Sequence, residues 1–177
     1  MRKSRILKVV TMALSVMMLF GFSNSVKAAE MQTDYLPEGW TRISESELSQ
    51  EQIKELTEQV SDSAENDKLR LAAPPLKSVQ IIDLALDEKN EIHVVVKEMG
   101  TSKSRSVYWN GRLCPENNNE TQNIVNGNIV VGYIRYFHSG VTYSSAVSGT
   151  SVSTSATFIN ARSPYNQIGA SQIFQIP

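Results

Sequence analysis

The chain has 177 residues, of which 41% are hydrophobic, 20% charged and 7% aromatic, and its formal net charge is −1. This composition is that of an ordinary soluble protein with about one domain's worth of residues. It excludes a collagen-like chain, a disulfide-dense miniprotein and a polytopic membrane protein. The near-neutral balance also argues against a nucleic-acid partner, because nucleic-acid binders usually present a basic face.

Residues 1–28 have the layout of a secretory signal peptide. An apolar run at residues 9–22 follows four basic residues: Arg2, Lys3, Arg5 and Lys8. The run is shorter than the roughly 20 residues that span a bilayer as a helix, so we expect a cleaved leader and no stable membrane insertion afterwards. Val26 and Ala28 fit the positions before the cut, which we place after Ala28, with cleavage after Ala29 as the second choice. The predicted location is therefore extracellular, outside a bacterial cell.

Residues 29–70 form an acidic segment with helical signals. Residues 30–70 hold 11 acidic and 4 basic residues, a net charge of −7, whereas residues 1–28 carry +5 and residues 71–177 carry +1. Ser44 and Ser49 each begin a capping box, and either could start a helix that runs to about Val60. The apolar stripe of this helix is narrow: Leu48, Ile53, Leu56 and Val60. Such a helix is marginal alone and needs a surface on which to dock.

Two interpretations of the acidic segment stay open. In the first, it is an exposed amphipathic helix that flanks a domain. In the second, it is a removable pro-segment that is cut between Ala64 and Ala73, because polar linkers are preferred sites of proteolysis.

Residues 71–177 change to strand-like alternation and predict an all-β domain. The candidate strands lie at residues 79–86, 92–97, 105–109, 129–137, 141–147, 152–159 and 171–176. Few helix signals interrupt them, so we predict a small β-sandwich of seven or eight mostly antiparallel strands, preceded by the acidic α-helical segment. Along residues 144–157, Ser and Thr predict a strand with one hydroxylated, solvent-facing side.

Turn signals separate several of these strands. Asn110-Gly111 and Asn126-Gly127 are both typical of type I′ hairpins, since both central residues tolerate positive φ. His138-Ser139-Gly140 predicts a further turn, which places His138 in a loop, while alternation places His93 on the less buried face of its strand.

Residues that could perform chemistry are few. The chain has one cysteine, Cys114, and no local hydrolase signature surrounds it. Two histidines, His93 and His138, exclude a multi-histidine zinc site, and a mixed site with Asp or Glu has no spacing signature. These residues favour a non-enzymatic protein without a cofactor or a metal, and a Cys114 nucleophile with a histidine base is the best enzyme hypothesis.

Aromatic and amide side chains are the stronger candidates for a binding site. They gather around the predicted hairpins: Tyr108, Trp109, Asn110, Tyr133, Tyr136 and Tyr143. Aromatic faces beside amide and hydroxyl groups suit sugar stacking or protein contact. The alternative is that the rings pack between the two sheets.

Three short motifs, VYWNG at 107–111, VVGYI at 130–134 and NARSPYNQIGAS at 160–171, resemble the YolA-like family of small secreted bacterial proteins of unknown function. The resemblance covers residues 74–177. It implies secretion and a compact β domain, and it transfers no catalytic or binding residues.

We therefore predict a secreted, non-enzymatic domain that binds at or outside the cell surface. Its predicted partner is a cell-wall polymer or another extracellular protein. The alternative is a secreted antimicrobial or toxin-like factor that is released from an acidic pro-segment.

Overall fold

The computed structural model describes residues 35–44, 48–61 and 74–177, which all fall within one compact unit, Gln32–Pro177. The predicted signal peptide and the predicted cleavage region between Ala64 and Ala73 lie outside these residues. Within the described ranges, no helix combines the length and the apolar character that crossing a bilayer requires.

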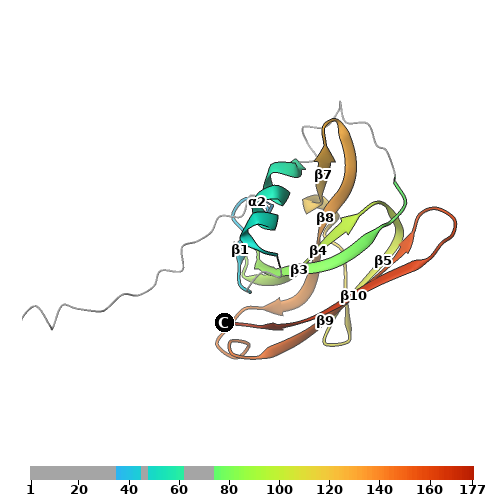
Figure 1. Cartoon of the computed structure of the whole chain (residues 1–177). Coiled ribbons are helices and arrows are strands. Elements are labelled where there is room, and N and C mark those ends of the chain that lie inside the picture. The colour runs from blue at the N-terminus through green and yellow to red at the C-terminus, as the bar shows by residue number, and fades with distance from the viewer. Residues whose placement is uncertain (1–34, 45–47, 62–73) are drawn as a thin grey trace, which may run out of the picture. The chain divides into compact units, whose positions relative to one another are not determined.

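The larger of the two sheets is six-stranded and antiparallel, in the order β1-β3-β4-β8-β7-β2 (Figure 1). Its strands are β1 (Thr41–Arg42), β2 (Val60–Ser61), β3 (Ser78–Leu86), β4 (Glu91–Met99), β7 (Gln122–Asn126) and β8 (Ile129–Thr142). Helix α2 (Gln50–Gln59) and the short 3-10 helix η2 (Asn118–Glu120) complete the elements outside the second sheet.

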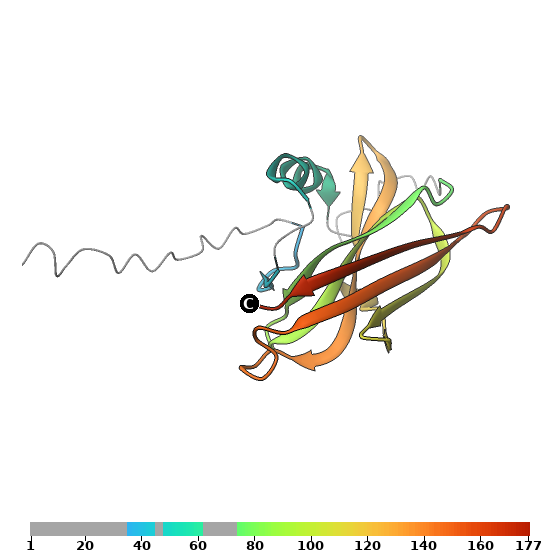
Figure 2. The same ribbon diagram turned by 60° about the horizontal axis from the view of Figure 1, so that its bottom comes forward.

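The smaller sheet is four-stranded and antiparallel, in the order β10-β9-β5-β6. Its strands are β5 (Ser102–Trp109), β6 (Arg112–Cys114), β9 (Ser151–Asn160) and β10 (Gln167–Gln175). The long strands β9 and β10 run side by side (Figure 2) and cover the inner face of β3. One apolar core, to which Val94 and Phe137 of the large sheet and Val107 and Phe158 of the small sheet belong, joins the two layers. The prediction of a small all-β sandwich is confirmed.

A second core lies on the opposite face of the large sheet and holds the helix there. Ile82, Val95 and Ile134 point away from the first core and pack with Leu56 and Tyr35. Because both faces of β4 are covered, residues 92–96 are all buried. The predicted alternation of buried and less buried residues therefore does not hold in this strand. The prediction that His93 lies on a less buried face is wrong, since its side chain is fully enclosed.

Helix α2 begins at Gln50, with Ser49, the second of the two predicted starts, as its N-cap. The Ser49 side chain accepts from the backbone of Gln52, and the Gln52 side chain accepts from the backbone of Ser49. This reciprocal pair is the predicted capping box. Leu48, Ile53 and Leu56 are buried, so the narrow apolar stripe docks as expected.

The turn predictions had mixed outcomes. Asn110 and Gly111 both have positive φ, 47° and 79°, and close the β5–β6 hairpin as predicted. The β7–β8 hairpin also forms, but Asn126 pairs with Ile129, so its central residues are Gly127 and Asn128 and only Gly127 has positive φ. A glycine at the first central position is typical of type II′ rather than type I′.

The predicted turn at residues 138–140 and the return strand at residues 141–147 are wrong. Strand β8 continues through His138 to Thr142, with a register irregularity against β4. Gly140 takes φ +70° there, so the extra residues are absorbed as a bulge and the ladder is not broken.

Candidate functional site

The aromatic residues predicted to bind a ligand fall in three different environments. Trp109 belongs to the core between the sheets, and Tyr136 belongs to the core under the helix. The Tyr136 hydroxyl is hydrogen-bonded to the backbone carbonyl of Tyr35 and lies 3.1 Å from the side-chain oxygen of Gln122. Both rings are enclosed, which is the alternative that the sequence left open for them.

Two further tyrosines are half-buried but engaged within the protein. The Arg135 guanidinium lies 4.4 Å from the centre of the Tyr133 ring. The Tyr143 hydroxyl donates to the carbonyl of Pro177 at 2.7 Å. Neither side chain lies on the small sheet.

Tyr108 and Asn110 are the two predicted residues that the structure brings to one surface. Tyr108 pairs with Ser155 of β9 and Leu113 of β6, and its ring is half-buried. Asn110 is exposed and accepts, through its side-chain oxygen, from the backbone of Ser153 at 2.9 Å. Tyr108 therefore belongs to the outer side of the small sheet, and Asn110 adjoins that side in the β5–β6 turn.

This outer side is an uncharged surface, which we call the hydroxyl face. Its members alternate along each strand with inward-facing residues such as Val152, Ala156 and Phe158. They are Ser104, Ser106, Tyr108, Leu113, Ser151, Ser153, Ser155, Thr157, Ile159, Gln167, Gly169, Ser171, Ile173 and Gln175. The predicted hydroxylated side is confirmed for residues 151–157, which lie in β9, whereas residues 144–150 precede that strand and contain a turn. β5 and β10 add further hydroxyl and amide groups, and β6 adds Leu113.

Apolar groups interrupt the hydroxyl face at intervals. Leu113 and Ile173 are 57% and 69% exposed, respectively. A shallow hollow lies beside Ile173, between Ser153 and Ser171. Hydroxyl and amide groups with scattered apolar contacts can hydrogen-bond and stack with a neutral polar ligand.

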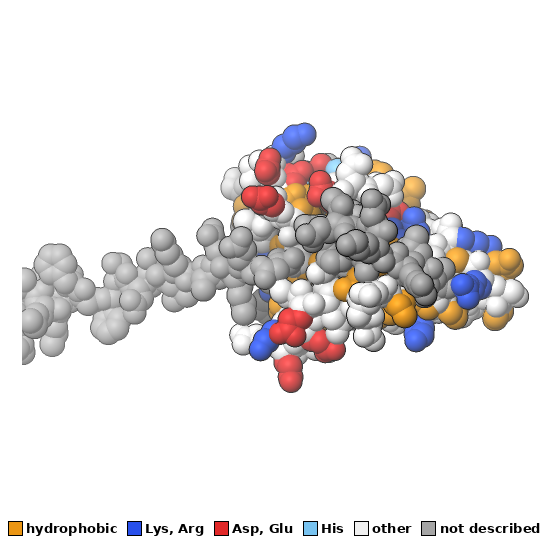
Figure 3. Space-filling model, turned by 90° about the horizontal axis from the view of Figure 1, so that it is seen from above, with side chains coloured by type: hydrophobic (Ala, Val, Ile, Leu, Met, Phe, Trp, Pro, Cys, Tyr) orange, Lys and Arg blue, Asp and Glu red, His pale blue; other side chains and the backbone are white. Residues whose placement is uncertain are grey.

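Charged side chains are arranged differently on the face seen in Figure 3, where acidic groups gather towards one end and basic groups towards the other. At the start of β5, the Lys103 ammonium lies 3.8 Å from the centre of the Tyr165 ring. The hydroxyl face differs from this charged face because its residues offer hydrogen bonds without an ionic group.

The two histidines, which were predicted to lie in a strand and in a loop, are neighbours. His93 of β4 pairs directly with His138 of β8, and their ring centres are 4.6 Å apart. Asp87 and Glu91 provide carboxylates: His93 Nε2 lies 3.2 Å from Asp87, and His138 Nδ1 lies 3.2 Å from Glu91. Sequence spacing missed this cluster because the pairing of β4 with β8 creates it.

The local environment sets the protonation of two members of this cluster. Burial lowers the pKa of His93, against the opposing effect of its hydrogen bond to Asp87, so the ring is neutral near pH 7. Burial by itself would raise the pKa of Asp87. Hydrogen bonds from the backbone of Glu91, from His93 and from the backbone of Lys89 outweigh it and lower that pKa, which keeps the carboxylate ionised.

Cys114 lies in the core between the sheets and is 3% exposed. Burial raises the pKa of its thiol to about 11. The thiol is therefore protonated at neutral pH, and a protonated thiol is a poor nucleophile. The hydrogen bond found for its sulfur runs to the carbonyl of Arg112.

Comparison with known families found a similarity within the β region. Residues 87–174 match the model of a domain of unknown function, DUF4879. The comparison with curated proteins and the comparison with solved structures each gave no match. The matched range runs from the turn before β4 into β10, so it contains the histidine cluster and every residue of the hydroxyl face except Gln175. The resemblance to the YolA-like family stays a prediction.

Proposed function

We propose that this protein is a secreted, non-enzymatic domain that binds an uncharged polysaccharide of the cell wall through the hydroxyl face. The observation that carries the proposal is the composition of that face. Hydroxyl and amide groups repeat along β5, β9 and β10, with Tyr108, Leu113 and Ile173 among them, and no residue of the face carries a charge.

The chemistry of a glycan complements such a surface. Neighbouring strands are about 4.8 Å apart and alternate outward residues about 6.8 Å apart, so the sheet presents a regular grid of donors and acceptors. Sugar hydroxyls can hydrogen-bond to this grid, and the apolar face of a sugar ring can pack on Tyr108. A charged polymer would find no counter-charge on the face itself.

The proposal also states that the protein is secreted, and the signal-peptide layout of residues 1–28 supports this. We expect the intact mass of the protein recovered from culture medium to correspond to a chain that starts at Ala29. A protein that stays inside the cell with residues 1–28 attached would contradict secretion.

Binding is tested by co-sedimentation of the protein with purified, insoluble cell-wall glycan. We expect retention that does not change between low and high salt, because no ion pair contributes to it. The double variant Ser155→Glu, Ser171→Glu places two charges on paired positions of β9 and β10. It should weaken retention by roughly tenfold or more, since burying unpaired charge costs more than the about 1.4 kcal/mol that this factor represents.

The matched control is Gln50→Glu, which adds a negative charge at an exposed position of α2. It should bind like the unmodified protein. Equal retention of the double variant would overturn the assignment of the face. Failure to bind glycan, together with specific capture of an extracellular protein, would overturn the choice of ligand.

A further inference from the structure

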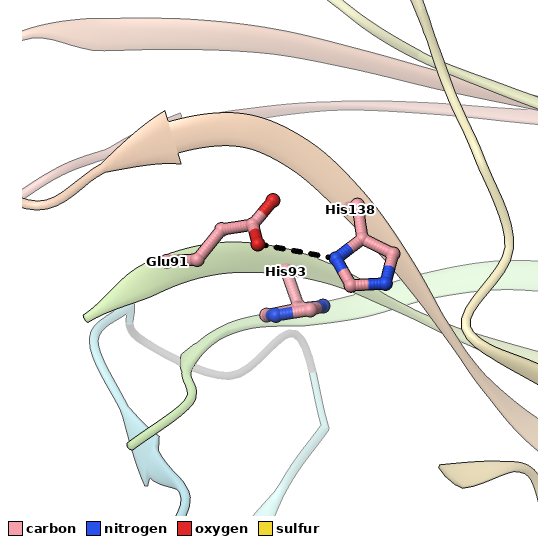
Figure 4. Close-up of side chains that lie close together, drawn as sticks. All are labelled: Glu91, His93 and His138. Carbon is pink, nitrogen blue, oxygen red and sulfur yellow. Dashed lines mark hydrogen bonds and ion pairs between the residues drawn. The ribbon is translucent and has the colours of Figure 1, made fainter. Parts of the chain in front are cut away.

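The histidine cluster has the composition and placement of a metal-ion site. Glu91, His93 and His138 each present one ligand atom, and these atoms lie within 4.8 Å of one another. Figure 4 shows the His93 ring beneath the contact that joins Glu91 to His138. Two imidazoles and one carboxylate form a donor set that suits Zn²⁺ and related divalent transition metals.

The spacing of one ligand pair is slightly shorter than tetrahedral coordination requires. Glu91 Oε2 and His138 Nδ1 are 3.2 Å apart. Zinc bonds of about 2.0–2.2 Å to oxygen and nitrogen place two ligands of a tetrahedron roughly 3.3–3.5 Å apart. The ion would therefore sit beside this pair after small side-chain movements.

His93 provides an independent indication of a ligand. Its side chain is fully buried, and its Nδ1 atom has no hydrogen-bond partner within the described part of the chain. Asp87 accepts from Nε2, so the proton belongs on Nε2 and Nδ1 keeps a free lone pair. A buried nitrogen without a partner is unfavourable, and coordination to a metal would satisfy it.

The surrounding residues support the same arrangement. A carboxylate that accepts from the far nitrogen of a metal-bound histidine is the usual outer partner in zinc sites, and Asp87 occupies that position. The backbone N–H of Gly140 donates to Glu91 Oε1 at 3.1 Å, which orients the carboxylate. The Trp40 ring covers His93, with ring centres 4.2 Å apart.

One side of the cluster remains open to solvent. The side chains of Glu91 and His138 are 27% and 35% exposed, whereas His93 lies behind them. An ion can therefore enter from solvent, and water can fill a fourth coordination position. The two exposed ligands can also adjust their positions when the ion binds.

We propose that Glu91, His93 and His138 bind one Zn²⁺ ion, with Asp87 as the carboxylate that orients His93. This site lies on β4 and β8, away from the strands of the hydroxyl face. The proposal therefore does not depend on the proposed glycan binding, and either can fail without the other.

The test is titration of the metal-free protein, purified after expression of the full chain, with Zn²⁺ and with Co²⁺. We expect one equivalent of Zn²⁺ with a dissociation constant in the micromolar range or tighter, measured by calorimetry. Co²⁺ at the same site should produce the visible absorption bands of a tetrahedral complex, and Zn²⁺ should remove them.

Variants at the half-exposed positions test the ligands without disturbing the core. His138→Gln and Glu91→Gln should each lower Zn²⁺ affinity at least tenfold and abolish the Co²⁺ bands. Asp87→Asn should weaken binding about 10- to 100-fold, as is usual for outer partners of zinc-bound histidines. Glu58→Gln, on the exposed side of α2, is the matched control and should leave affinity unchanged.

The thermal unfolding of each metal-free variant is measured first, so that loss of binding is not confused with loss of folding. Absence of Zn²⁺ binding by the unmodified protein would overturn the proposal. The proposal would also be overturned if His138→Gln and Glu91→Gln both fold and bind Zn²⁺ as tightly as the unmodified protein.

Discussion

Two fully buried carboxylates, Asp83 and Glu98, show how single residues hold this fold together. Burying a charge is costly unless it is paired and hydrogen-bonded. Glu98 accepts from Arg135 and from the backbone of Ser102, and Arg135 also donates to Glu116 at 2.7 Å. Glu116 in turn accepts from Arg105 of the small sheet at 2.7 Å. This ion network connects the two layers of the sandwich.

Arg135→Met is expected to destabilise the protein by about 3–5 kcal/mol, because it leaves Glu98 buried without its cation. The free energy of unfolding in urea measures the effect. The double variant Arg135→Met, Glu98→Met removes both charges and should be closer to the unmodified protein than the single variant is. Equal destabilisation of the two variants would contradict an uncompensated charge as the cause.

At the residue scale, the sequence showed which side chains could take part in chemistry but not their surroundings. Trp109 and Tyr136 have the side-chain types of a binding site, yet both are enclosed. His93 and His138 are 45 positions apart in the chain, and strand pairing brings them together. The pattern of neighbouring residues along the chain contains no information on such pairings. They depend on which strands lie next to each other in the sheet.

The elements illustrate when local signals are sufficient. Helix α2 was predicted from a capping box and an apolar stripe, both of which are contained within a few residues. The β5–β6 hairpin was predicted from Asn110-Gly111, whose φ angles a two-residue turn requires. Strand β8 was cut short in the prediction because Ser139 and Gly140 are typical turn residues. Pairing with β4 on both sides of the bulge carries the strand through them.

The cap of α2 gives a prediction at the scale of the element. Ser49→Ala removes the side-chain acceptor for the backbone of Gln52 and should cost about 1 kcal/mol of unfolding free energy. Ser155→Ala, on the hydroxyl face, is the comparison and should lie within about 0.5 kcal/mol of the unmodified protein. Equal costs for the two variants, measured by urea unfolding, would mean that the cap contributes nothing specific.

At the scale of the whole molecule, the described part of the acidic segment is built into the sandwich. Strand β1 pairs with β3, and β2 pairs with β7. The buried carboxylate of Asp83 is bound by Tyr35, Arg42 and Ser44. Burial, and then the nearby charge of Asp83, raise the pKa of Tyr35, so its hydroxyl stays protonated and donates.

A fragment of residues 71–177 is therefore expected to lose cooperative unfolding. It would expose Ile82, Val95 and Ile134. It would also remove the partners of Asp83 that lie in the acidic segment. Dye binding to exposed apolar surface and the loss of a sharp thermal transition measure the outcome. A fragment that unfolds cooperatively at the temperature of the full chain would show that the segment is dispensable.

The pro-segment interpretation can be tested in the same system. A protease site introduced within residues 64–73 allows the chain to be cut after folding. We expect the two pieces to stay together during gel filtration, because β1, β2 and α2 remain docked. Spontaneous separation in native buffer would instead favour a segment that is released.

The sequence by itself determined the all-β architecture, the capped helix, the Asn110-Gly111 hairpin and the hydroxylated side of β9. Each depends on periodicity or on backbone preferences within a short window. Only the tertiary structure decided that α2 covers one sheet, that Trp109 and Tyr136 are enclosed, and that Glu91, His93 and His138 converge. These outcomes depend on which strands pair and which faces are covered. Contacts between residues far apart in the chain determine both, through the burial of apolar surface and the pairing of buried charges.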